Sequence, residues 1–580
     1  MWDATWRETA WAQLDQEWDM LIIGGGITGA GIFREAARLG LRVLLVDQHD
    51  FGWGTSSRSS KFVHGGLRYL KEGQLGLTRS AVLEREQLLA DAPGLVDPIG
   101  FLLATYRRDK IGRTVYRAGL AIYDLLALQW SHRYYSPADF QLLAPHIEAE
   151  GLKGGFHYQD AQTDDARLVL RVLQEGATDG RRRAIPLNYA AVTDLLRDAN
   201  GQVCGATVRD EVTGQSQPVR ARAVVNATGS WVDRLRRQVG GEEKIRPLRG
   251  SHLIFPGWRL PVAQVVTFLH PVDQRPVMVF PWEGATMVGT TDVDHPHDDL
   301  TEPCISPEEV AYLMAAVTAE FPSLNIQLRD VIATQAGVRP VIGTGKEDPS
   351  EESREHVLWL EEGLLTVTGG KLTTFRLIAH DALKVLHGRF PDWPPLDEKI
   401  PALTPTPPDL LADVPLDSHL RRRLCGRYGA LAADLVAAAQ EGELDTIPGT
   451  RYVWAELRWA AQAEGVQHLE DLLLRRLRLG LLLPEGGRAH LPRIRAICQA
   501  ALGWSDGRWQ DEEAAYLALW QRAYSLPPLE TIPDWRAMLA RVEMDTAVTV
   551  HHPARRTWVA GVLVGAAVVL TAVWLWRRKR

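Results

Sequence analysis

The most constraining feature of this chain is a glycine-rich turn that joins two apolar runs near the N-terminus. The first run ends at Ile23 and leads into Gly24, Gly26 and Gly29, and the second run ends at Asp47. Glycines at this spacing permit a tight turn, close approach of the backbone to a pyrophosphate, and close packing of a helix on the first strand. The helix N-terminus favours an anion, and a carboxylate that ends the second strand can bind ribose hydroxyls. The pattern predicts a βαβ unit that binds a dinucleotide.

Length, net charge and cysteine spacing limit the number of domains and the kinds of site that this chain can form. A chain of 580 residues is expected to form two or three domains, because single cores stop growing near about 250 to 300 residues. The net charge of −7 argues against a nucleic-acid-binding protein, whose binding surface is normally basic. The four cysteines are far apart and form no CxxC pair, so neither a zinc site nor a disulfide framework is predicted.

The two ends of the chain bear on where the protein resides. The first 20 residues are acidic and lack an apolar core, unlike a secretory signal, so we expect the N-terminus to stay in the cytoplasm. Residues 557–576 form an uncharged apolar run, long enough as a helix to cross the roughly 30 Å hydrocarbon layer. This run predicts a transmembrane tail anchor. The basic residues that flank it mildly oppose a cytoplasmic catalytic body, but the missing signal sequence favours one, on the cytoplasmic face of the inner (plasma) membrane. The alternative is a buried C-terminal helix. A GxxxG motif at Gly561 and Gly565 could pair two such helices in a homodimer.

Strand-to-turn signals recur along the chain and indicate an interrupted nucleotide-binding fold. After the first βαβ unit, such signals lie at residues 223–229 and 364–371, each followed by a helix-like run. The β-rich pieces between them are typical of a mostly antiparallel sheet. The predicted fold is α/β, with a Rossmann-like dinucleotide-binding domain interleaved with a mostly antiparallel β substrate domain. The expected segments are 18–75, about 160–250 and about 335–388 for the first domain, and 76–159 and about 251–334 for the second.

The C-terminal part of the chain has a different composition. Prolines recur through residues 389–415, which blocks regular structure and marks a linker. Residues 416–545 show helical periodicity with many Leu, Ala and Arg, so a separate α-helical domain is predicted before the tail. Within this domain, residues 468–480 carry a stripe of arginines, which we expect to form a solvated or interfacial face.

A dense group of polar residues follows the predicted nucleotide-binding unit. Residues 55–70 hold hydroxyls, cations, a histidine and paired glycines. Hydroxyls and exposed backbone N–H groups can bind phosphate oxygens and flavin ring edges, and paired glycines let the backbone pass close to a flat cofactor. Arg68 and Tyr69 could then point toward a substrate, although a solvated polar loop is the alternative.

Short motifs occur in a specific order over roughly residues 18 to 485. They are Ile-Gly-Gly-Gly-Ile-Thr-Gly-Ala-Gly at 23–31, the polar group at 55–70, Asp-Asp-Ala-Arg-Leu at 164–168, Asn-Ala-Thr-Gly at 226–229, Gly-Ser-His at 250–252, Gly-Thr-Thr-Asp at 289–292, Gly-Val-Arg-Pro at 337–340 and Gly-Gly-Lys-Leu-Thr-Thr at 369–374. In this order they closely resemble the respiratory, quinone-linked FAD-dependent glycerol-3-phosphate dehydrogenases, which belong to a larger group with the D-amino-acid oxidases.

This resemblance implies FAD as the cofactor, with its adenine half on the βαβ unit and its flavin ring between the interleaved domains. It also implies glycerol 3-phosphate as substrate, dihydroxyacetone phosphate as product, a membrane quinone as electron acceptor and a possible homodimer. Family members commonly dock on the lipid bilayer without a final spanning helix, so the apolar tail departs from the family pattern. The residues that we expect to contact FAD are Gly24, Gly26, Thr28, Gly29, Asp47, Thr55, Ser56, Ser57, Ser60, Lys61, His64, Gly65, Ala227, Thr228, Gly229, Gly370, Lys371, Leu372 and Thr373.

Oxidation of a secondary alcohol requires hydride transfer to flavin N5 and loss of the hydroxyl proton, so a base or a cation must stand beside the alcohol. His252 is the first candidate for the base and His64 the second, although either could be a core histidine. Lys371 follows two glycines where a helix begins. It can place charge near the pyrimidine edge of the flavin or contact the substrate hydroxyl, and the sequence does not separate these roles.

A phosphorylated substrate requires forked cations. Arg339, in the Gly-Val-Arg-Pro turn, is the first candidate for a phosphate ligand because a guanidinium offers bidentate hydrogen bonds. Arg68 and Arg354 line up with cation positions of the family and come next. For any single arginine, a surface ion pair is the alternative.

Three rival functions remain open at this point. A D-amino-acid-oxidase-like flavin oxidase would need fewer cations, because one arginine can clamp a carboxylate. A peroxide-forming glycerol-3-phosphate oxidase would run the same oxidation with oxygen as acceptor. A non-catalytic protein could keep the nucleotide-binding fold as a scaffold, since fold alone does not establish chemistry.

Overall fold

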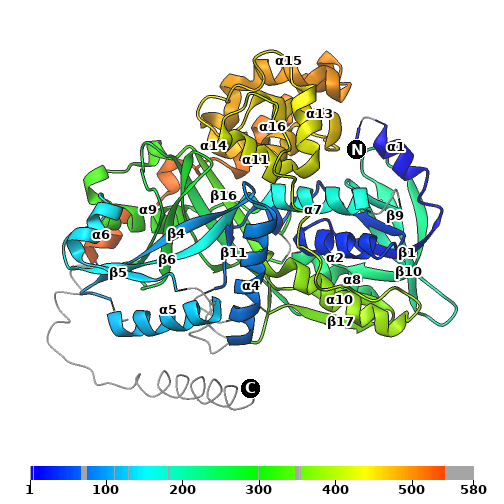
Figure 1. The fold of residues 1–580 in the computed structure, drawn as a ribbon, viewed down its shortest axis with the longest axis horizontal. Coiled ribbons are helices and arrows are strands. Elements are labelled where there is room, and N and C mark those ends of the chain that lie inside the picture. Colours follow the sequence, from blue (N-terminus) through cyan, green and yellow to red (C-terminus); the bar gives the residue numbers. More distant parts are fainter. Residues whose placement is uncertain are drawn as a thin grey trace.

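The computed structural model describes residues 2–3, 5–66, 75–109, 112–127, 130–179, 183–297, 299–345, 352 and 355–541. The predicted substrate ligands Arg68, Tyr69 and Arg354 lie outside the described residues, as does the predicted transmembrane segment 557–576. Within the described part of the chain, no helix is both long and apolar enough to span a bilayer. Two sheets stand side by side, and a group of helices from the C-terminal part covers one end of them (Figure 1).

The first sheet has eight strands, with β17-β18-β10-β1-β2-β7 as its main path and the hairpin of β8 and β9 paired to β10. Strands β18, β10, β1, β2 and β7 run parallel. The strands are β1 (Glu17–Ile23), β2 (Val43–Val46), β7 (Ala184–Leu187), β8 (Ala190–Arg197), β9 (Val203–Asp210), β10 (Ser216–Asn226), β17 (Val357–Glu361) and β18 (Leu364–Thr368).

Both faces of this sheet are buried, which explains why its central strands read as continuous apolar runs. Along β1, Met20 and Ile22 belong to the core under α2 (Ile27–Arg38), α7 (Asp165–Asp179) and α10 (Phe375–Arg389). Leu21 and Ile23 belong to the core on the other face. That face is covered by α1 (Trp6–Trp11) and by the sequence of short helices η2 (Gly229–Trp231), α8 (Val232–Arg236) and η3 (Arg237–Val239).

The second sheet has ten strands in the order β15-β11-β14-β13-β12-β4-β6-β3, with β16 paired to β11 and β5 paired to β6. It is antiparallel apart from the pair of β4 and β12. Its strands are β3 (Phe62–Val63), β4 (Val96–Tyr106), β5 (Arg133–Tyr135), β6 (Leu152–Thr163), β11 (Ile245–Pro256), β12 (Val265–Leu269), β13 (Pro276–Trp282), β14 (Ala285–Gly289), β15 (Val293–Asp294) and β16 (Ala333–Ile342). Its helices are α4 (Leu75–Asp91), α5 (Arg113–Ala127), α6 (Pro137–Leu143), α9 (Pro307–Glu320), η4 (Pro322–Leu324) and η5 (Leu328–Asp330).

The pairing of β16 corrects one of the expected boundaries. Residues 335–342 were expected in the nucleotide-binding domain, but β16 pairs along its whole length with β11 in the second sheet. The hydrophobic pattern predicts that a segment is a strand, but it carries no information about which distant strand becomes its partner. The interleaving of two sheets along the chain is as predicted.

The C-terminal part is helical, as predicted. It comprises α11 (Ser418–Tyr428), η8 (Gly429–Leu431), α12 (Ala432–Ala438), α13 (Trp454–Ala463), the π-helix η9 (Asp471–Arg476), α14 (Leu479–Leu482), η10 (Pro484–His490), α15 (Leu491–Leu502), α16 (Asp506–Ala523) and η11 (Leu529–Thr531). One hydrophobic cluster, which includes Leu424 and Leu435, lies wholly within this part. A second is shared, because Leu473, Leu482 and Trp520 pack in one cluster with Phe156 and Phe280 of the second sheet. Residues 390–417 contain neither helix nor strand.

The arginine stripe of residues 468–480 is interfacial and not solvated. The side chains of Arg475, Arg476 and Arg478 are 2%, 0% and 1% exposed. All three contact acidic residues that lie outside the helical domain, at Asp50 or Asp165. The periodicity of the sequence suggested a polar face, but only the docking of two parts of the chain shows that this face is buried.

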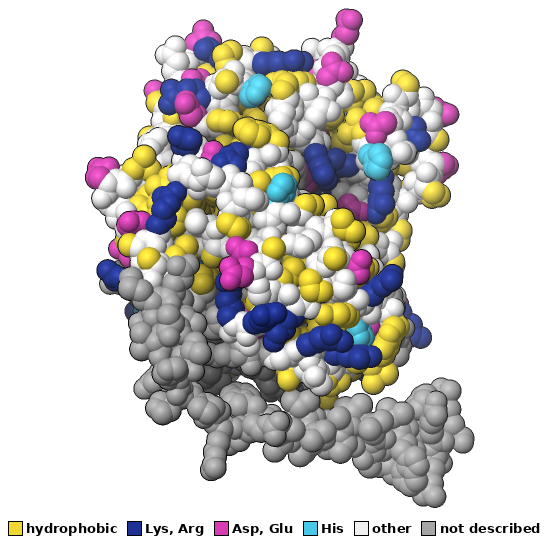
Figure 2. Space-filling view, turned by 90° about the vertical axis from the view of Figure 1, so that its left-hand side faces the viewer, with side chains coloured by type: hydrophobic (Ala, Val, Ile, Leu, Met, Phe, Trp, Pro, Cys, Tyr) yellow, Lys and Arg dark blue, Asp and Glu magenta, His cyan; other side chains and the backbone are white. Residues whose placement is uncertain are grey.

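Helix α5 presents apolar side chains on two faces. Leu120 and Tyr123 are buried, whereas Val115 and Leu125 on another face of the helix are 51% and 48% exposed. Trp130, shortly after the helix, is 74% exposed. In Figure 1 this helix lies at the end of the molecule away from the C-terminal helices. Figure 2, which views one side of the molecule, shows Lys and Arg side chains next to hydrophobic ones in the lower half of that side.

The tight packing of the glycine turn generates a prediction. A Cβ added at Gly29 would lie 1.9 Å from the carbonyl oxygen of Gly24. We expect Gly29→Ala to lower the free energy of unfolding by about 1 to 3 kcal/mol, through overpacking, and to reduce the FAD content of the purified protein. Thermal unfolding and flavin absorbance measure these effects.

Gly388→Ala is the matched control, because Gly388 lies in α10 and a Cβ there meets nothing within 4 Å. Alanine is the better helix former by roughly 1 kcal/mol, so this variant should be neutral or slightly more stable. Wild-type stability and FAD content in Gly29→Ala would show that the helix does not pack on the turn as described.

Candidate active site

The glycine turn after β1 has the shape that close backbone contact requires. Gly24 has a φ of +110°, and a Cβ there would lie 2.5 Å from the carbonyl oxygen of Ala227. Gly26 is the residue that precedes α2, and Thr28 lies in the first turn of that helix. The side chain of Ser56 accepts a hydrogen bond of 2.9 Å from the Ile27 N–H. The turn therefore brings bare backbone and a helix N-terminus to one place, with a hydroxyl beside them.

Asp47 ends β2 next to this turn, as predicted. Its carboxylate accepts hydrogen bonds from the N–H groups of Gly25, at 2.6 Å, and His49, at 2.9 Å. Burial raises the pKa of Asp47 to about 7, in spite of these two N–H groups. The carboxylate is thus held at the mouth of the turn, where an acceptor for ribose hydroxyls is required.

The ends of two further parallel strands meet the glycine turn. Strand β10, the neighbour of β1, leads into Ala227, Thr228 and Gly229, and β18, the neighbour of β10, leads into Gly369 and Gly370. The Ala227 N–H donates to the carbonyl of Ile23 at 2.8 Å. The hydroxyl of Thr368 donates to the carbonyl of Gly229 at 3.3 Å. Ligands of open α/β sheets bind at the carboxyl ends of the strands, so the three predicted motifs meet where a dinucleotide would lie.

The polar segment after Asp47 runs from the first sheet to the second. Its helix η1 (Thr55–Ser57) carries three of the predicted hydroxyls. The Thr55 hydroxyl donates to the carbonyl of Val338 on β16. Ser60 Oγ lies 2.9 Å from Nε2 of His252 on β11. This segment therefore connects the nucleotide side of the site to the substrate sheet.

Two of the residues predicted to contact the cofactor also have close partners within the protein. The Lys61 ammonium is buried 2.8 Å from Asp165 Oδ2, and burial lowers the pKa of Lys61 to about 7. The Gly65 N–H donates to the Tyr123 hydroxyl at 3.0 Å, and a Cβ at Gly65 would lie 2.3 Å from Val82. The spacing of polar residues in a sequence cannot show which way an ammonium group turns.

Strand pairing brings His252 and Arg339 to the same part of the second sheet. Strands β11 and β16 are antiparallel, with His252 opposite Gln335 and Leu248 opposite Arg339. A Cβ at Gly250 would lie 2.3 Å from Nη2 of Arg339, so the absence of a side chain at Gly250 makes room for the guanidinium. The Gly-Ser-His and Gly-Val-Arg-Pro motifs are therefore one structural unit.

His252 is almost fully buried, with 1% of its surface exposed. Burial, together with the nearby positive charges of Lys61 and Arg339, lowers the pKa of His252 to about 3. Its Nδ1 has no hydrogen-bond partner within the described part of the chain. The imidazole is therefore neutral at physiological pH, which is the state required of a proton acceptor.

His64 and Lys371 form a second group of predicted residues. The His64 N–H donates to the Thr373 hydroxyl at 3.1 Å. Burial, and then the charge of Lys371, lowers the pKa of His64 to about 3. Lys371 directly precedes η7 (Leu372–Thr374), which leads into α10. His64, on the segment that continues from Ser60, is thus a neighbour of the predicted residues 371–373.

Arg339 has an acidic partner that was not among the predicted site residues. Its Nη1 donates to Asp292 Oδ1 at 3.0 Å, and its Nη2 donates to the Thr290 hydroxyl at 3.1 Å. Glu309, on α9, accepts a hydrogen bond of 2.6 Å from the hydroxyl of Thr291. The Gly-Thr-Thr-Asp motif at 289–292 was a signal for this pairing, because it places an acid among otherwise uncharged residues.

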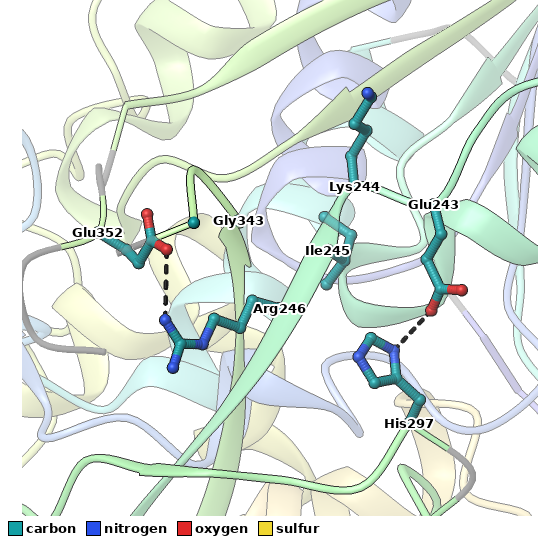
Figure 3. A pocket seen from close by; sticks show the side chains of 8 residues that line it. Glu243, Lys244, Ile245, Arg246, His297, Gly343 and Glu352 are labelled. Carbon is teal, nitrogen blue, oxygen red and sulfur yellow. Dashed lines mark hydrogen bonds and ion pairs between the residues drawn. The ribbon is translucent and has the colours of Figure 1, made fainter. Parts of the chain in front are cut away.

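A separate hollow of about 450 Å³ lies where β11 begins and β16 ends (Figure 3). Its basic side chains are each paired with an acid: Arg246 with Glu352 at 3.3 Å, His297 with Glu243 at 2.7 Å, and Lys244 with Glu242 at 2.9 Å. None of the predicted site residues is among the described residues that line this hollow. The glycine turn and the pair of His252 and Arg339 remain the candidate active site. No group of acids, His and Cys in the described part of the chain could hold a metal ion.

Comparison with known proteins identifies the family of the chain. Residues 19–376 match the family described as FAD dependent oxidoreductase, and residues 402–509 match the C-terminal domain of alpha-glycerophosphate oxidase. The chain is 35% identical over 488 residues to the aerobic glycerol-3-phosphate dehydrogenase of Staphylococcus aureus (strain MRSA252), which covers 80% of this chain and 87% of that protein.

Solved structures agree as well. The glycerol-3-phosphate dehydrogenase from Bacillus halodurans, complexed with FAD, matches with a TM-score of 0.73 and 27% identity over 90% of this chain and 98% of that one. The L-alpha-glycerophosphate oxidase from Mycoplasma pneumoniae, with FAD bound, shares the fold with a TM-score of 0.52 and 17% identity over 68% of this chain and 99% of that one.

The residues present fit an FAD. The turn at Gly24 and Gly26 leaves bare backbone for a pyrophosphate, Asp47 is placed for a ribose, and the segment at 55–60 leads from there to the substrate sheet. The resemblance inferred from the sequence motifs is confirmed. The chain belongs to the FAD-dependent oxidoreductases that carry a glycerophosphate-oxidase-type C-terminal domain, and its cofactor is FAD.

Proposed function

We propose that this protein oxidises glycerol 3-phosphate to dihydroxyacetone phosphate and passes the electrons to a membrane quinone. One observation carries the proposal: a neutral, buried imidazole, His252, and a partly exposed guanidinium that reaches Gly250, Arg339, belong to the paired strands β11 and β16, and residues 56–60 link them to the FAD-binding turn. The 35% identity to an aerobic glycerol-3-phosphate dehydrogenase supports this choice of substrate. A base and a cation are the groups that a phosphorylated secondary alcohol requires.

His252 accepts the hydroxyl proton in this proposal. Bound FAD supplies the two-electron acceptor for the hydride of the carbinol carbon. When the imidazole carries its own proton on Nε2, it donates to Ser60 Oγ, 2.9 Å away, and Nδ1 keeps a lone pair that can take the substrate proton. The Ser60 hydroxyl can donate as well as accept, so this contact holds the ring in place in either tautomer. His64 is the second candidate for the same role.

Arg339 binds the phosphate in this proposal, with Arg68, Tyr69, Arg354 and Lys371 as further substrate ligands. Its side chain is 26% exposed, and the bond to Asp292 fixes the plane of the guanidinium. A set of several cations suits a doubly charged phosphate better than the single carboxylate of an amino acid. This reasoning favours glycerol 3-phosphate over a D-amino acid as substrate.

Anaerobic titration of the purified holoenzyme tests the proposal. We expect glycerol 3-phosphate, and not D-alanine, to bleach the flavin absorbance. A flavin that stays oxidised with glycerol 3-phosphate, or that D-amino acids reduce instead, would contradict the assignment.

The yield of peroxide per substrate oxidised in air separates the rival oxidase from a dehydrogenase. A dehydrogenase should yield little peroxide and should reduce a quinone analogue.

Arg339→Ala sharpens the same titration. Each lost charge-assisted hydrogen bond is worth roughly 1.5 to 3 kcal/mol, so the substrate concentration at half reduction should rise on the order of 10- to 100-fold. Arg259→Ala is the matched control, because Arg259 forms a comparable ion pair of 2.8 Å with Asp330 and its side chain is 21% exposed. Equal titration curves for wild type and Arg339→Ala would remove Arg339 from the substrate site.

His252→Asn tests the proposed base. In single turnover the rate constant of flavin reduction should fall on the order of 100-fold or more, with FAD still bound, because the proton acceptor is lost.

The pKa of His252 near 3 also sets the expected pH dependence of the rate constant of flavin reduction. The imidazole is neutral between pH 5 and 9, so the wild-type rate constant should not decrease as the pH falls through 6.5. A loss of rate centred near pH 6.5 that disappears in His252→Asn would show that the histidine titrates normally.

A membrane location is part of the proposal and has two supports. Helix α5 exposes Val115 and Leu125 beside the exposed basic residues Arg113 and Arg117, a composition that suits the surface of an anionic bilayer. The apolar segment 557–576 would add a tail anchor on the cytoplasmic face of the inner membrane. A surface-bound body would place the enzyme within reach of a quinone pool. Pairing of two tails would make a homodimer.

Vesicle sedimentation tests the membrane contact of α5. In protein that lacks residues 557–580, we expect Arg113→Glu combined with Arg117→Glu to reduce binding to anionic vesicles, because two cations become anions. The control pair is Arg488→Glu with Arg493→Glu, two exposed positions in the C-terminal helices. Equal binding of both double variants would argue against a membrane contact of α5.

Deletion of residues 557–580 by itself tests the anchor. If the truncated protein, with α5 unchanged, stays fully in the membrane fraction, this result would argue against a tail anchor.

A further inference from the structure

A network of buried charges joins the C-terminal helical domain to the segment that connects the nucleotide turn to the substrate sheet. The arginines of the network are Arg475, Arg476 and Arg478, and its acids outside the helical domain are Asp50 and Asp165. The side chains of all five are at most 2% exposed. Burying charged groups carries a large desolvation cost, so the question is what this arrangement holds in place.

The first half of the network holds the beginning of the segment. Asp50 lies three residues beyond the ribose acid Asp47. It accepts hydrogen bonds of 2.6 Å from Arg475 Nε and 2.5 Å from Arg476 Nη1. Both arginines belong to the π-helix η9, a rare helical form that is often found at functional sites. In this wide turn two consecutive arginines reach the same carboxylate.

The second half of the network holds residues 57–61. Arg478 donates to the Ser57 carbonyl and, at 3.3 Å, to Asp165 Oδ1. Lys61 binds the same two groups, at 2.8 Å from the Ser57 carbonyl and 2.8 Å from Asp165 Oδ2. Asp165 also accepts hydrogen bonds from the N–H group of Ser59, at 3.0 Å, and from its hydroxyl, at 2.7 Å.

The held segment ends at the proposed base. Ser60 lies between Ser59 and Lys61, which Asp165 binds, and its hydroxyl is 2.9 Å from His252 Nε2. The orientation of the imidazole thus depends on a short segment with little regular structure beyond η1. The carboxylate that holds this segment is in turn neutralised by cations from two directions, and one of them, Arg478, belongs to a different domain.

We propose that Arg478 is a positioning residue: by binding the Ser57 carbonyl and Asp165 it sets the place of residues 57–61, and through Ser60 it orients His252 for proton acceptance. This inference rests on the proposed function for its catalytic consequence. The contact itself does not depend on the substrate. The C-terminal domain is then part of the active-site machinery although it supplies no group that touches the substrate.

The test uses the full-length holoenzyme with three variants. Arg478→Gln removes the positive charge, and Arg478→Lys keeps it on a shorter side chain. Arg427→Gln is the matched control, because Arg427 also lies in the C-terminal domain, is 1% exposed and forms a 2.9 Å ion pair with Asp164. Within the described part of the chain, Arg427 forms no hydrogen bond to residues 57–61. Two measurements are made on each: hydrogen exchange of the peptide that covers residues 55–63, and the rate constant of flavin reduction by glycerol 3-phosphate in single turnover.

We expect Arg478→Gln to raise exchange in this peptide and to lower the reduction rate constant on the order of 10- to 100-fold, because small displacements of a catalytic group carry losses of this size. The substrate concentration at half-maximal rate should change less than about threefold, since the substrate cations are untouched. Arg478→Lys should recover part of the rate. Arg427→Gln should keep both exchange at 55–63 and the rate constant near wild type, even if its melting temperature falls.

Unchanged exchange and rate in Arg478→Gln would overturn the inference, and so would an equal loss of rate in Arg427→Gln. Should Arg478→Gln fail to fold, a double-mutant cycle of Arg478→Lys and Ser60→Ala decides the question. If Arg478 acts through Ser60, the effect of Arg478→Lys on the rate constant must shrink in the Ser60→Ala background, whereas additive effects contradict the proposal. If glycerol 3-phosphate fails to reduce the wild-type flavin, the proposed function is wrong, and the exchange measurement still decides the contact.

Discussion

The structure depends on the parallel pairing of β1, β10 and β18, three strands that come from distant parts of the chain. Their carboxyl ends lie at one edge of the sheet, so the turn at Gly24 meets the turns at Gly229 and Gly370. Gly24 lacks a side chain where the end of β10 approaches, because a Cβ there would lie 2.5 Å from the Ala227 carbonyl oxygen. A dinucleotide can lie against this edge because bare backbone and a helix N-terminus meet there.

The second sheet adds chemistry to this binding edge by the same means. Strand β11 carries His252 and the paired strand β16 carries Arg339, whose guanidinium fills the space that Gly250 leaves, two residues from His252. The segment that contains Ser60 crosses from the first sheet to the second and bonds to His252. Buried arginines of the helical domain hold this segment through Asp50 and Asp165, so three parts of the chain converge on one imidazole.

Much of the fold and part of the site could be predicted from the residues alone. The spacing of Gly24, Gly26 and Gly29 and the acid at Asp47 predicted a local βαβ unit, and local geometry needs no knowledge of the rest of the chain. The helical C-terminal part and the interleaved sheets followed from periodicity. The prediction for residues 335–342 was wrong because a strand pattern does not name its partner strand. Lys61 stays a predicted cofactor contact, but the sequence could not show that a buried Asp165, more than a hundred positions away, binds its ammonium.

The sequence by itself determined the chemistry that is local: which turns can approach a pyrophosphate, which residues can carry charge or a proton, and which segments alternate as strands. Only the tertiary structure decided which of these groups stand together and which are used internally. The arginines at 475–478 illustrate the division, because their periodicity fits a solvated or an interfacial face, and only packing shows that they are buried against Asp50 and Asp165. The physical reason is that a charge acquires its role from its partner and its exposure to water, and both are set by contacts between residues far apart in the chain.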